Sequence, residues 1–224
     1  MTAIFVTATG TDIGKTFVTA GVIRHLRREG RSVAAVKPVV TGFDPGAPDG
    51  SDPAVLLAAL GRTATLDEIA RISPWRFKAP LAPGMAAARE GSTLDFDAVI
   101  EFSRQEIATP SDILLIEGIG GVMVPLDARR TVLDWMAALN LPLILVAGSY
   151  LGTISHTLTA LDTLARRNLR IAALVVSETG GSEVPLADTI ATIAGFAAPV
   201  AVVGLPRLRP GADHSAFGEI AALL

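Results

Sequence analysis

Cysteine is absent from this 224-residue chain, and its absence excludes several kinds of site. Without thiols the chain by itself cannot form disulfides, thiolate zinc sites, iron–sulfur clusters or a cysteine nucleophile. The absence also fits a reducing compartment, so we expect a cytoplasmic protein.

An excess of positive charge is also absent, because the formal net charge is −3. A chain of this charge has no global attraction to nucleic acid or to an anionic membrane surface. No apolar run approaches the roughly 18 residues that a membrane span requires. The first residues, Met1–Val6, have no basic segment before their apolar run, which is typical of a first strand and not of a signal peptide. We therefore expect neither a nucleic-acid partner nor a membrane partner.

Hydrophobic residues make up 50% of the chain, and they gather in short runs rich in Val, Ile and Leu that alternate with amphipathic stretches. This alternation predicts a single α/β domain over residues 1–224, with a mostly parallel sheet covered by helices on both faces. The predicted strands are Ile4–Thr7, Val33–Lys37, Ile113–Glu117, Leu143–Ala147, Ile171–Val176 and Val200–Val203. The predicted helices are Thr16–Glu29, Phe96–Ile107, Val132–Leu139, Ile154–Arg167 and Val184–Ile193, with Gly30 and Asn140 as helix-ending residues.

The segment from Val40 to Gly91 breaks this alternation, because glycine and proline recur throughout it. So many helix and strand breakers predict long loops that carry short helices. Long loops in a compact α/β domain usually carry functional residues.

A phosphate-binding loop is the strongest local signal, in Val6-Thr7-Ala8-Thr9-Gly10-Thr11-Asp12-Ile13-Gly14-Lys15-Thr16. A predicted strand enters this loop and a predicted helix leaves it, so backbone N–H groups and the helix dipole converge on an anion. Lys15 supplies a charge for the β- and γ-phosphates, and the Thr16 hydroxyl can bind Mg²⁺. Thr9 stands where the strict pattern has glycine, and the alternative is a strand–turn–helix that merely contains Gly-Lys-Thr.

Acidic residues that could hold the metal lie at two further places. Glu117 ends a predicted buried strand, at the edge where parallel sheets bind ligands; the alternative is an acid that only caps the following turn. Asp52 precedes a helical stretch, and an ordinary helix N-cap is the more common role for such a residue. Asp12 lies inside the phosphate loop and could orient the loop or the metal.

A second lysine, Lys37, closes the second predicted strand and is followed by Pro38. A lysine at this edge of the sheet can stabilise a carbamate or a phosphoryl group in transfer. The alternative is a lysine whose ammonium extends into solvent.

The three histidines are scattered and lack metal-ligand spacing, so they predict no metal site. His156 is expected to serve in the core or in a helix cap.

These motifs, taken in order, resemble the dethiobiotin synthetases, from Met1 to about Pro206. The resemblance is carried by the phosphate loop, Lys37-Pro38-Val39 with Thr41-Gly42, Ser51-Asp52, Glu117-Gly118-Ile119-Gly120-Gly121, Pro125-Leu126, Leu151-Gly152-Thr153-Ile154-Ser155-His156 and Gly204-Leu205-Pro206. It implies a P-loop NTPase-like three-layer fold and an ATP- and Mg²⁺-dependent ligase. That ligase closes the ureido ring of 7,8-diaminononanoate with CO₂, giving dethiobiotin, ADP and phosphate.

The resemblance also implies a role for individual residues. Lys15, Lys37 and Thr11 would be catalytic; Thr16, Asp52 and Glu117 would ligate Mg²⁺; and Thr41 with Lys37 would contact the diamine or its carbamate. Gly152, Thr153 and Ser155 would receive the diamine's carboxylate across a homodimer interface. ATP would contact Asp12, Ile13, Gly14, Lys15, Thr16, Phe17, Asp52, Glu117, Gly118, Ile119, Gly120, Ser177, Glu178 and Pro206. Ser177 occupies a position where the family often has an asparagine that reads the adenine edge.

Three other functions remain open on the sequence. A nucleotide switch of the ParA/MinD kind shares the fold class, but the chain has no basic surface run and no basic amphipathic C-terminal helix. A relative of the cobyrinate amidotransferases would need a glutaminase domain with a cysteine. A non-enzymatic nucleotide-binding module would not need both lysines and the acids.

Overall fold

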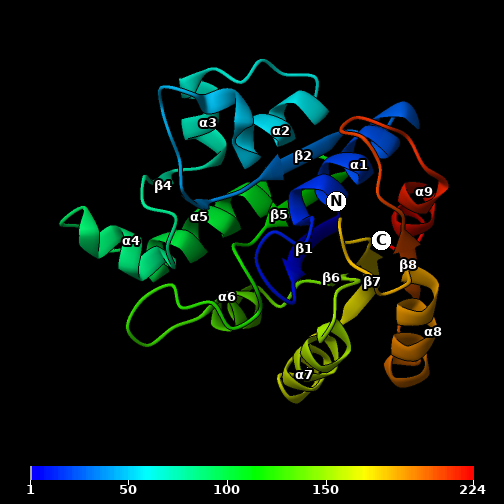
Figure 1. Ribbon diagram of the computed structural model, residues 1–224. Coiled ribbons are helices and arrows are strands. Elements are labelled where there is room, and N and C mark those ends of the chain that lie inside the picture. Colours follow the sequence, from blue (N-terminus) through cyan, green and yellow to red (C-terminus); the bar gives the residue numbers. More distant parts are fainter. Residues whose placement is uncertain (1) are drawn as a thin grey trace.

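The computed structural model describes residues 2–224, and its centre is a six-stranded sheet in which every neighbouring pair is parallel (Figure 1). The strand order is β2-β5-β1-β6-β7-β8. The bounds are β1 Thr2–Ala8, β2 Val33–Val36, β5 Ile113–Glu117, β6 Leu143–Gly148, β7 Ile171–Ser177 and β8 Val202–Leu205. The six strands predicted from the sequence are therefore confirmed, with small shifts at their ends.

The central strands are buried along almost their whole length. All five residues of β5 and all six of β6 are buried, as the unbroken apolar runs predict for strands covered on both faces. Trp135 is fully buried and meets the ring of Phe5 edge-on, with centroids 5.0 Å apart, while its indole N–H donates to Ser103. The core is thus continuous from the sheet into the helical layer.

Helices cover both faces of the sheet, which gives the three-layer architecture that the alternation predicts. α1 (Lys15–Arg28) packs against α2 (Asp52–Ala59) and α9 (Ser215–Ala221) on one side. The other side carries α5 (Phe96–Ala108), α6 (Val132–Leu139), α7 (Thr153–Arg166) and α8 (Leu186–Ala197). Right-handed crossovers explain the division, because α1 connects β1 to β2 in one direction along the sheet, whereas α5, α6, α7 and α8 lie in connections that run the opposite way, from β2 toward β8.

The helix ends follow the predicted signals. Asn140 ends α6 in the left-handed conformation with φ 50°, and Gly30 follows α1 with φ 78°. The helix α9 was not predicted, because its seven residues lie in a segment rich in glycine and proline. Within residues 2–224, no helix is both long enough and apolar enough to cross a membrane.

The segment from Val40 to Gly91 contains short helices, as predicted: η1 (Pro48–Gly50), α2, α3 (Leu66–Ile72) and α4 (Pro83–Arg89). It also contains a feature that the sequence did not predict, a small parallel sheet of β3 (Val39–Thr41) and β4 (Trp75–Phe77). Strands of three residues are too short to show a periodic pattern. This small sheet holds Thr41 beside the carboxyl end of β2.

The strand order decides which residues meet at the carboxyl edge of the sheet. β5 lies between β2 and β1, so Glu117 at the end of β5 is flanked by Lys37 after β2 and by the phosphate loop after β1. These three features come from distant parts of the chain, and only the parallel sheet brings them together.

Two glycines in helix interiors should respond to alanine in opposite ways. A Cβ on Gly21 in α1 would lie 2.1 Å from the ring of Phe217, whereas a Cβ on Gly195 in α8 meets nothing within 4 Å. Gly21→Ala should lower the free energy of unfolding by about 1–3 kcal/mol through overpacking. Gly195→Ala should raise it by about 0.5–1 kcal/mol, since alanine favours a helix. Urea unfolding measures both, and an unchanged Gly21→Ala would contradict this packing of α9 on α1.

Candidate active site

The phosphate loop is folded to receive an anion. It runs from Thr9 to Gly14 between β1 and α1, and two of its residues, Asp12 with φ 57° and Gly14 with φ 101°, are left-handed. No side chain caps the N-terminus of α1, so the first N–H groups of this helix are free to bind oxygen ligands. The loop therefore has the curled backbone that a phosphate cradle requires.

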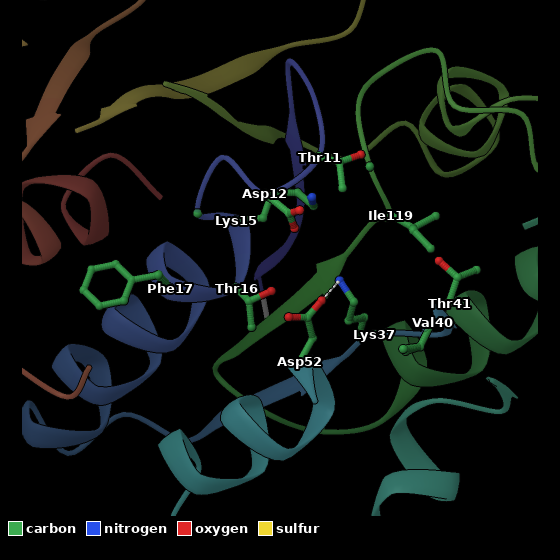
Figure 2. A pocket seen from close by; sticks show the side chains of 12 residues that line it. Thr11, Asp12, Lys15, Thr16, Phe17, Lys37, Val40, Thr41, Asp52 and Ile119 are labelled. Carbon is green, nitrogen blue, oxygen red and sulfur yellow. Dashed lines mark ion pairs between the residues drawn. The ribbon is translucent and has the colours of Figure 1, made fainter. Parts of the chain in front are cut away.

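A cavity of about 320 Å³, called here the phosphate cavity, opens between this loop and the long segment after β2 (Figure 2). Side chains from the phosphate loop face others from the ends of β2 and β3 and from the start of α2. The cavity is lined by Thr11, Asp12, Gly14, Lys15, Thr16, Phe17, Lys37, Val40, Thr41, Asp52, Ile119 and Gly120. Apart from Val40, each of these residues was a candidate from the sequence.

Lys37 is the centre of the charged groups in this cavity, and its side chain is only 3% exposed. Its ammonium lies 2.7 Å from Glu117 Oε1 and 2.9 Å from Asp52 Oδ2, and it also donates to the carbonyl of Gly118 at 3.3 Å. Figure 2 shows Lys37 and Asp52 pointing toward each other, with Thr16 beside them. The alternative of a lysine extending into solvent is therefore wrong.

Asp52 does not act as a helix N-cap, which was the more common role for such a residue. Ser51 caps α2 by accepting from Ala54 N–H, and Asp52 occupies the first turn with its carboxylate on Lys37. Burial disfavours the charge of Asp52, but the attraction of Lys37 and a hydrogen bond from Lys37 hold the pKa of Asp52 below the ordinary value.

Glu117 is fully buried behind the phosphate cavity and does not line it. Its Oε1 accepts from the Thr16 hydroxyl at 2.6 Å and from Lys37, whereas its Oε2 is buried and has no hydrogen-bond partner among residues 2–224. A free buried carboxylate oxygen is costly unless a ligand completes it. This orphaned oxygen is therefore not explained by a role in capping the turn.

The donor set of Thr16, Asp52 and Glu117 fits a magnesium ion. Within residues 2–224, no group of three or more His, Cys, Asp or Glu side chains is placed to enclose a metal by itself. Mg²⁺ does not need one, because it usually binds one or two carboxylates together with waters and the phosphates of a substrate. The two carboxylates and the hydroxyl beside the phosphate loop match this coordination preference of Mg²⁺.

The pKa values of the two lysines, Lys15 and Lys37, are shifted in opposite directions. Burial and the repulsion of Lys37 lower the pKa of Lys15 to about 8. Burial would also lower the pKa of Lys37, yet the attraction of Glu117 and Asp52 holds it above its ordinary value. Lys37 is thus compensated within the protein, whereas Lys15 gains most from an arriving anion.

A second cavity of about 430 Å³, called here the apolar cavity, adjoins the phosphate cavity at Thr11. Its walls come from the phosphate loop, from the turn after Gly120 and from α7, and they are mostly apolar. They are Thr9, Gly10, Thr11, Gly121, Val122, Met123, Val124, Pro125, His156, Thr159, Ala160 and Thr163. His156 was expected in the core or in a cap, but it is exposed, lines this cavity and bonds to the Tyr150 hydroxyl at 2.9 Å.

A third cavity of about 270 Å³, called here the base-side cavity, adjoins the phosphate cavity at Asp12, Gly14 and Phe17. It contains the candidates Ile13, Ser177, Glu178 and Pro206. It also contains residues that the sequence did not single out: Thr179, Gly180, Arg207, Leu208 and Pro210. Their places within four residues after Glu178 or Pro206 are the signal that could have identified them.

The remaining candidates lie outside these three cavities. Gly118 follows Glu117 behind the phosphate cavity, where a Cβ would lie 2.9 Å from Phe5. Gly152, Thr153 and Ser155 start α7, and the Thr153 hydroxyl already donates to the carbonyl of Gly148 at 2.8 Å. Gly152 and Ser155 are exposed, and the neighbouring Leu151 side chain is 91% exposed.

Known structures show the same fold. The MinC:MinD cell division protein complex of Aquifex aeolicus aligns with a TM-score of 0.57 at 11% identity, over 100% of this chain and 86% of the matched chain. A likeness at this identity concerns the arrangement of the strands and helices. It confirms the predicted P-loop NTPase-like architecture.

Sequence relatives are much closer. The model of an AAA domain family matches residues 2–209. The ATP-dependent dethiobiotin synthetase of Acidiphilium cryptum is 47% identical over 84% of this chain and 85% of its own length. That of Phenylobacterium zucineum is also 47% identical, over 99% of this chain and 96% of its own length. The chain is therefore a member of the ATP-dependent dethiobiotin synthetase family.

Proposed function

We propose that this chain closes the ureido ring of 7,8-diaminononanoate with CO₂ and ATP, giving dethiobiotin, ADP and phosphate. The observation that carries the proposal is the meeting of Lys15, Lys37, Asp52 and Thr41 on one cavity beside a phosphate loop. Family membership at 47% identity supports the same reaction. ATP serves as the phosphoryl donor.

The three cavities match the three parts of the reactants. The phosphate cavity takes the triphosphate, and the base-side cavity takes the nucleoside. The apolar cavity suits the hydrocarbon chain of the diamine, because its walls include Val122, Met123 and Val124. Thr11 lines both the phosphate cavity and the apolar cavity, so a diamine there would bring its amines to the triphosphate.

The proposed ring closure proceeds in three steps. One amine attacks CO₂, loses a proton and becomes a carbamate. A carbamate oxygen attacks the γ-phosphorus, the bond to the bridging oxygen breaks, and ADP leaves. The second amine attacks the carbamoyl carbon and loses a proton, and phosphate departs as the ring closes. Such a reaction depends on positioning and on charge stabilisation, which fixed lysines and backbone N–H groups provide.

Each charged residue has a distinct part in this scheme. Lys15 neutralises the β- and γ-phosphates, and Lys37 stabilises the carbamate and the phosphoryl group in transfer. Thr16, Asp52 and Glu117 would hold Mg²⁺, which neutralises phosphate charge when bound. Lys37 contacts both Asp52 and Glu117, so its ammonium lies beside the residues that would hold Mg²⁺.

We also propose a homodimer whose interface completes the diamine site. The N-terminus of α7 has no side-chain cap, and Gly152 there has φ 97°. The Thr153 N–H donates to the Tyr150 carbonyl at 3.0 Å, and the N–H groups that follow it at the start of this 14-residue helix favour a carboxylate. In a dimer, Gly152, Thr153 and Ser155 would receive the carboxylate of a diamine held mainly by the partner.

The reaction itself can be tested with purified protein, ATP, Mg²⁺ and bicarbonate. Phosphate release should depend on the diamine and should yield one cyclic urea per phosphate. Lys37→Ala should lower kcat by about 10²–10³-fold, the usual cost of losing a transition-state contact, while ATP still binds. Phosphate release at the same rate with and without the diamine would contradict the ligase function. Normal turnover by Lys37→Ala would contradict the role of this lysine.

Lys37 should also be a stabilising element in the absence of nucleotide. Lys37→Met leaves Glu117 buried without its cation, so the free energy of unfolding should fall by about 3–5 kcal/mol. Lys37→Met combined with Glu117→Met should recover most of this loss, because the pair is then replaced by apolar side chains. Urea unfolding compares the two variants, and equal stability of the single variant and the parent would contradict the buried ion pair.

The shared site can be tested by mixing two inactive variants. Lys37→Ala removes the lysine, and Gly152→Val strains the start of α7 because φ 97° disfavours a β-branched residue. If the two residues serve one site from different protomers, each mixed dimer keeps one intact site, and activity should recover to about a quarter of the parent's. Recovery should not occur if Gly152 serves the site of its own chain.

A further inference from the structure

The base-side cavity contains a side chain that can distinguish one base from another. In the proposed function this cavity holds the nucleoside of ATP. The apolar side chains of Phe17, Leu208 and Pro210 can bind any flat ring, since such walls do not read hydrogen-bond patterns. Selection between bases must therefore come from the polar groups of the cavity.

Ser177 is not the selecting residue. Its side chain is directed at the phosphate loop, because a Cβ on Gly14 would lie 3.0 Å from the Ser177 hydroxyl. A hydroxyl can also both donate and accept, so it would tolerate an amine or a carbonyl equally. This position often holds a base-reading asparagine in the family. Here it carries a hydroxyl that does not distinguish an amine from a carbonyl on the base.

Glu178, the next residue, has the required properties. Its backbone N–H donates to the carbonyl of Leu205 at 2.8 Å, and its Oε2 accepts from the backbone N–H of Arg207 at 2.7 Å. Among residues 2–224, its other carboxylate oxygen has no hydrogen-bond partner. An ionised carboxylate only accepts hydrogen bonds, so this oxygen favours an amine and repels a carbonyl.

The loop that carries Glu178 is held in place by its neighbours. Thr179 N–H donates to the Ser149 hydroxyl at 2.9 Å, and Ser149 N–H donates to the Thr179 hydroxyl at 3.0 Å. Ser182 adds a third bond by donating to the carbonyl of Ser149 at 2.7 Å. The loop is therefore held before a nucleotide arrives, and the bond from the Arg207 N–H positions the Glu178 carboxylate on it, as specific recognition requires.

Arg207 supplies binding without selection. A Cβ on Gly180 would lie 2.7 Å from Arg207 Cζ, so the guanidinium lies against the loop at the rim of the cavity. Within the described chain it makes no ion pair with a carboxylate. A guanidinium can stack on the face of any base, so Arg207 raises affinity for all nucleotides alike.

We propose that Glu178 is the base-selecting residue and that its free carboxylate oxygen accepts a hydrogen bond from the exocyclic amine of adenine. Hypoxanthine carries a carbonyl at that position, and a carboxylate repels it. The chain should therefore prefer ATP to inosine triphosphate (ITP), whose sugar and phosphates are the same.

The test measures binding of ATP and of ITP by calorimetry, with Mg²⁺ and without the diamine. The parent should bind ATP about tenfold more tightly than ITP, as expected for about 1.4 kcal/mol of discrimination. In Glu178→Gln the ratio should fall to about twofold or less, because the amide can donate to the hypoxanthine carbonyl. Glu183→Gln, which changes an exposed acid of the same loop outside the cavity, is the matched control and should keep the parent's ratio.

Two results would overturn the proposal. Equal affinity of the parent for ATP and ITP would show that no residue selects the amine. An equal loss of both affinities in Glu178→Gln would show that Glu178 only supports the turn at Arg207. The binding test contains no diamine and is therefore independent of ring closure. If the chain prefers ATP to ITP but does not form the cyclic urea in the turnover test, only the proposed reaction is refuted. A chain that binds neither nucleotide would refute both proposals.

Discussion

The buried ammonium of Lys37 between Glu117 and Asp52 is the interaction on which the rest of the site depends. Glu117 ends β5, Lys37 follows the paired strand β2, and Asp52 comes from α2, which has no strand pairing with β5. A buried charge is tolerated only when it is paired, so the Lys37–Asp52 ion pair holds the start of α2 against the end of β2 at the cavity. In the proposed reaction the same charges would stabilise phosphoryl transfer, so one set of atoms would serve both stability and chemistry.

The family and the reaction class could be predicted from the sequence because their signals are local. The strand before Gly10 and the helix after Gly14 identify the phosphate loop without knowledge of distant contacts, and Lys37-Pro38 marks the end of a buried run. The α/β architecture follows from the same alternation of patterns. Where helix and strand were long enough to be periodic, the predicted bounds agree with the structure to within a few residues.

The features that were missed depend on contacts between distant residues. Neither the β3–β4 sheet nor α9 has enough residues to show a period. The alternatives for Asp52 and Lys37 could not be decided from the sequence, because spacing does not show that α2 starts beside the end of β2. Arg207 was not predicted, because it holds Glu178 through its backbone N–H and a backbone contact does not depend on the residue type.

The bond between the Thr16 hydroxyl and Glu117 spans 101 positions of sequence. Under the proposed function, a chain in which the sheet has not assembled has the phosphate loop but lacks the joined Thr16 and Glu117 that would hold a metal–triphosphate complex. A ligand that binds only the assembled state shifts the folding equilibrium toward that state by mass action. In a cell, the nucleotide pool would thus act on this enzyme as a folding effector as well as a reactant, and a newly made chain would be most vulnerable to proteolysis when that pool is depleted.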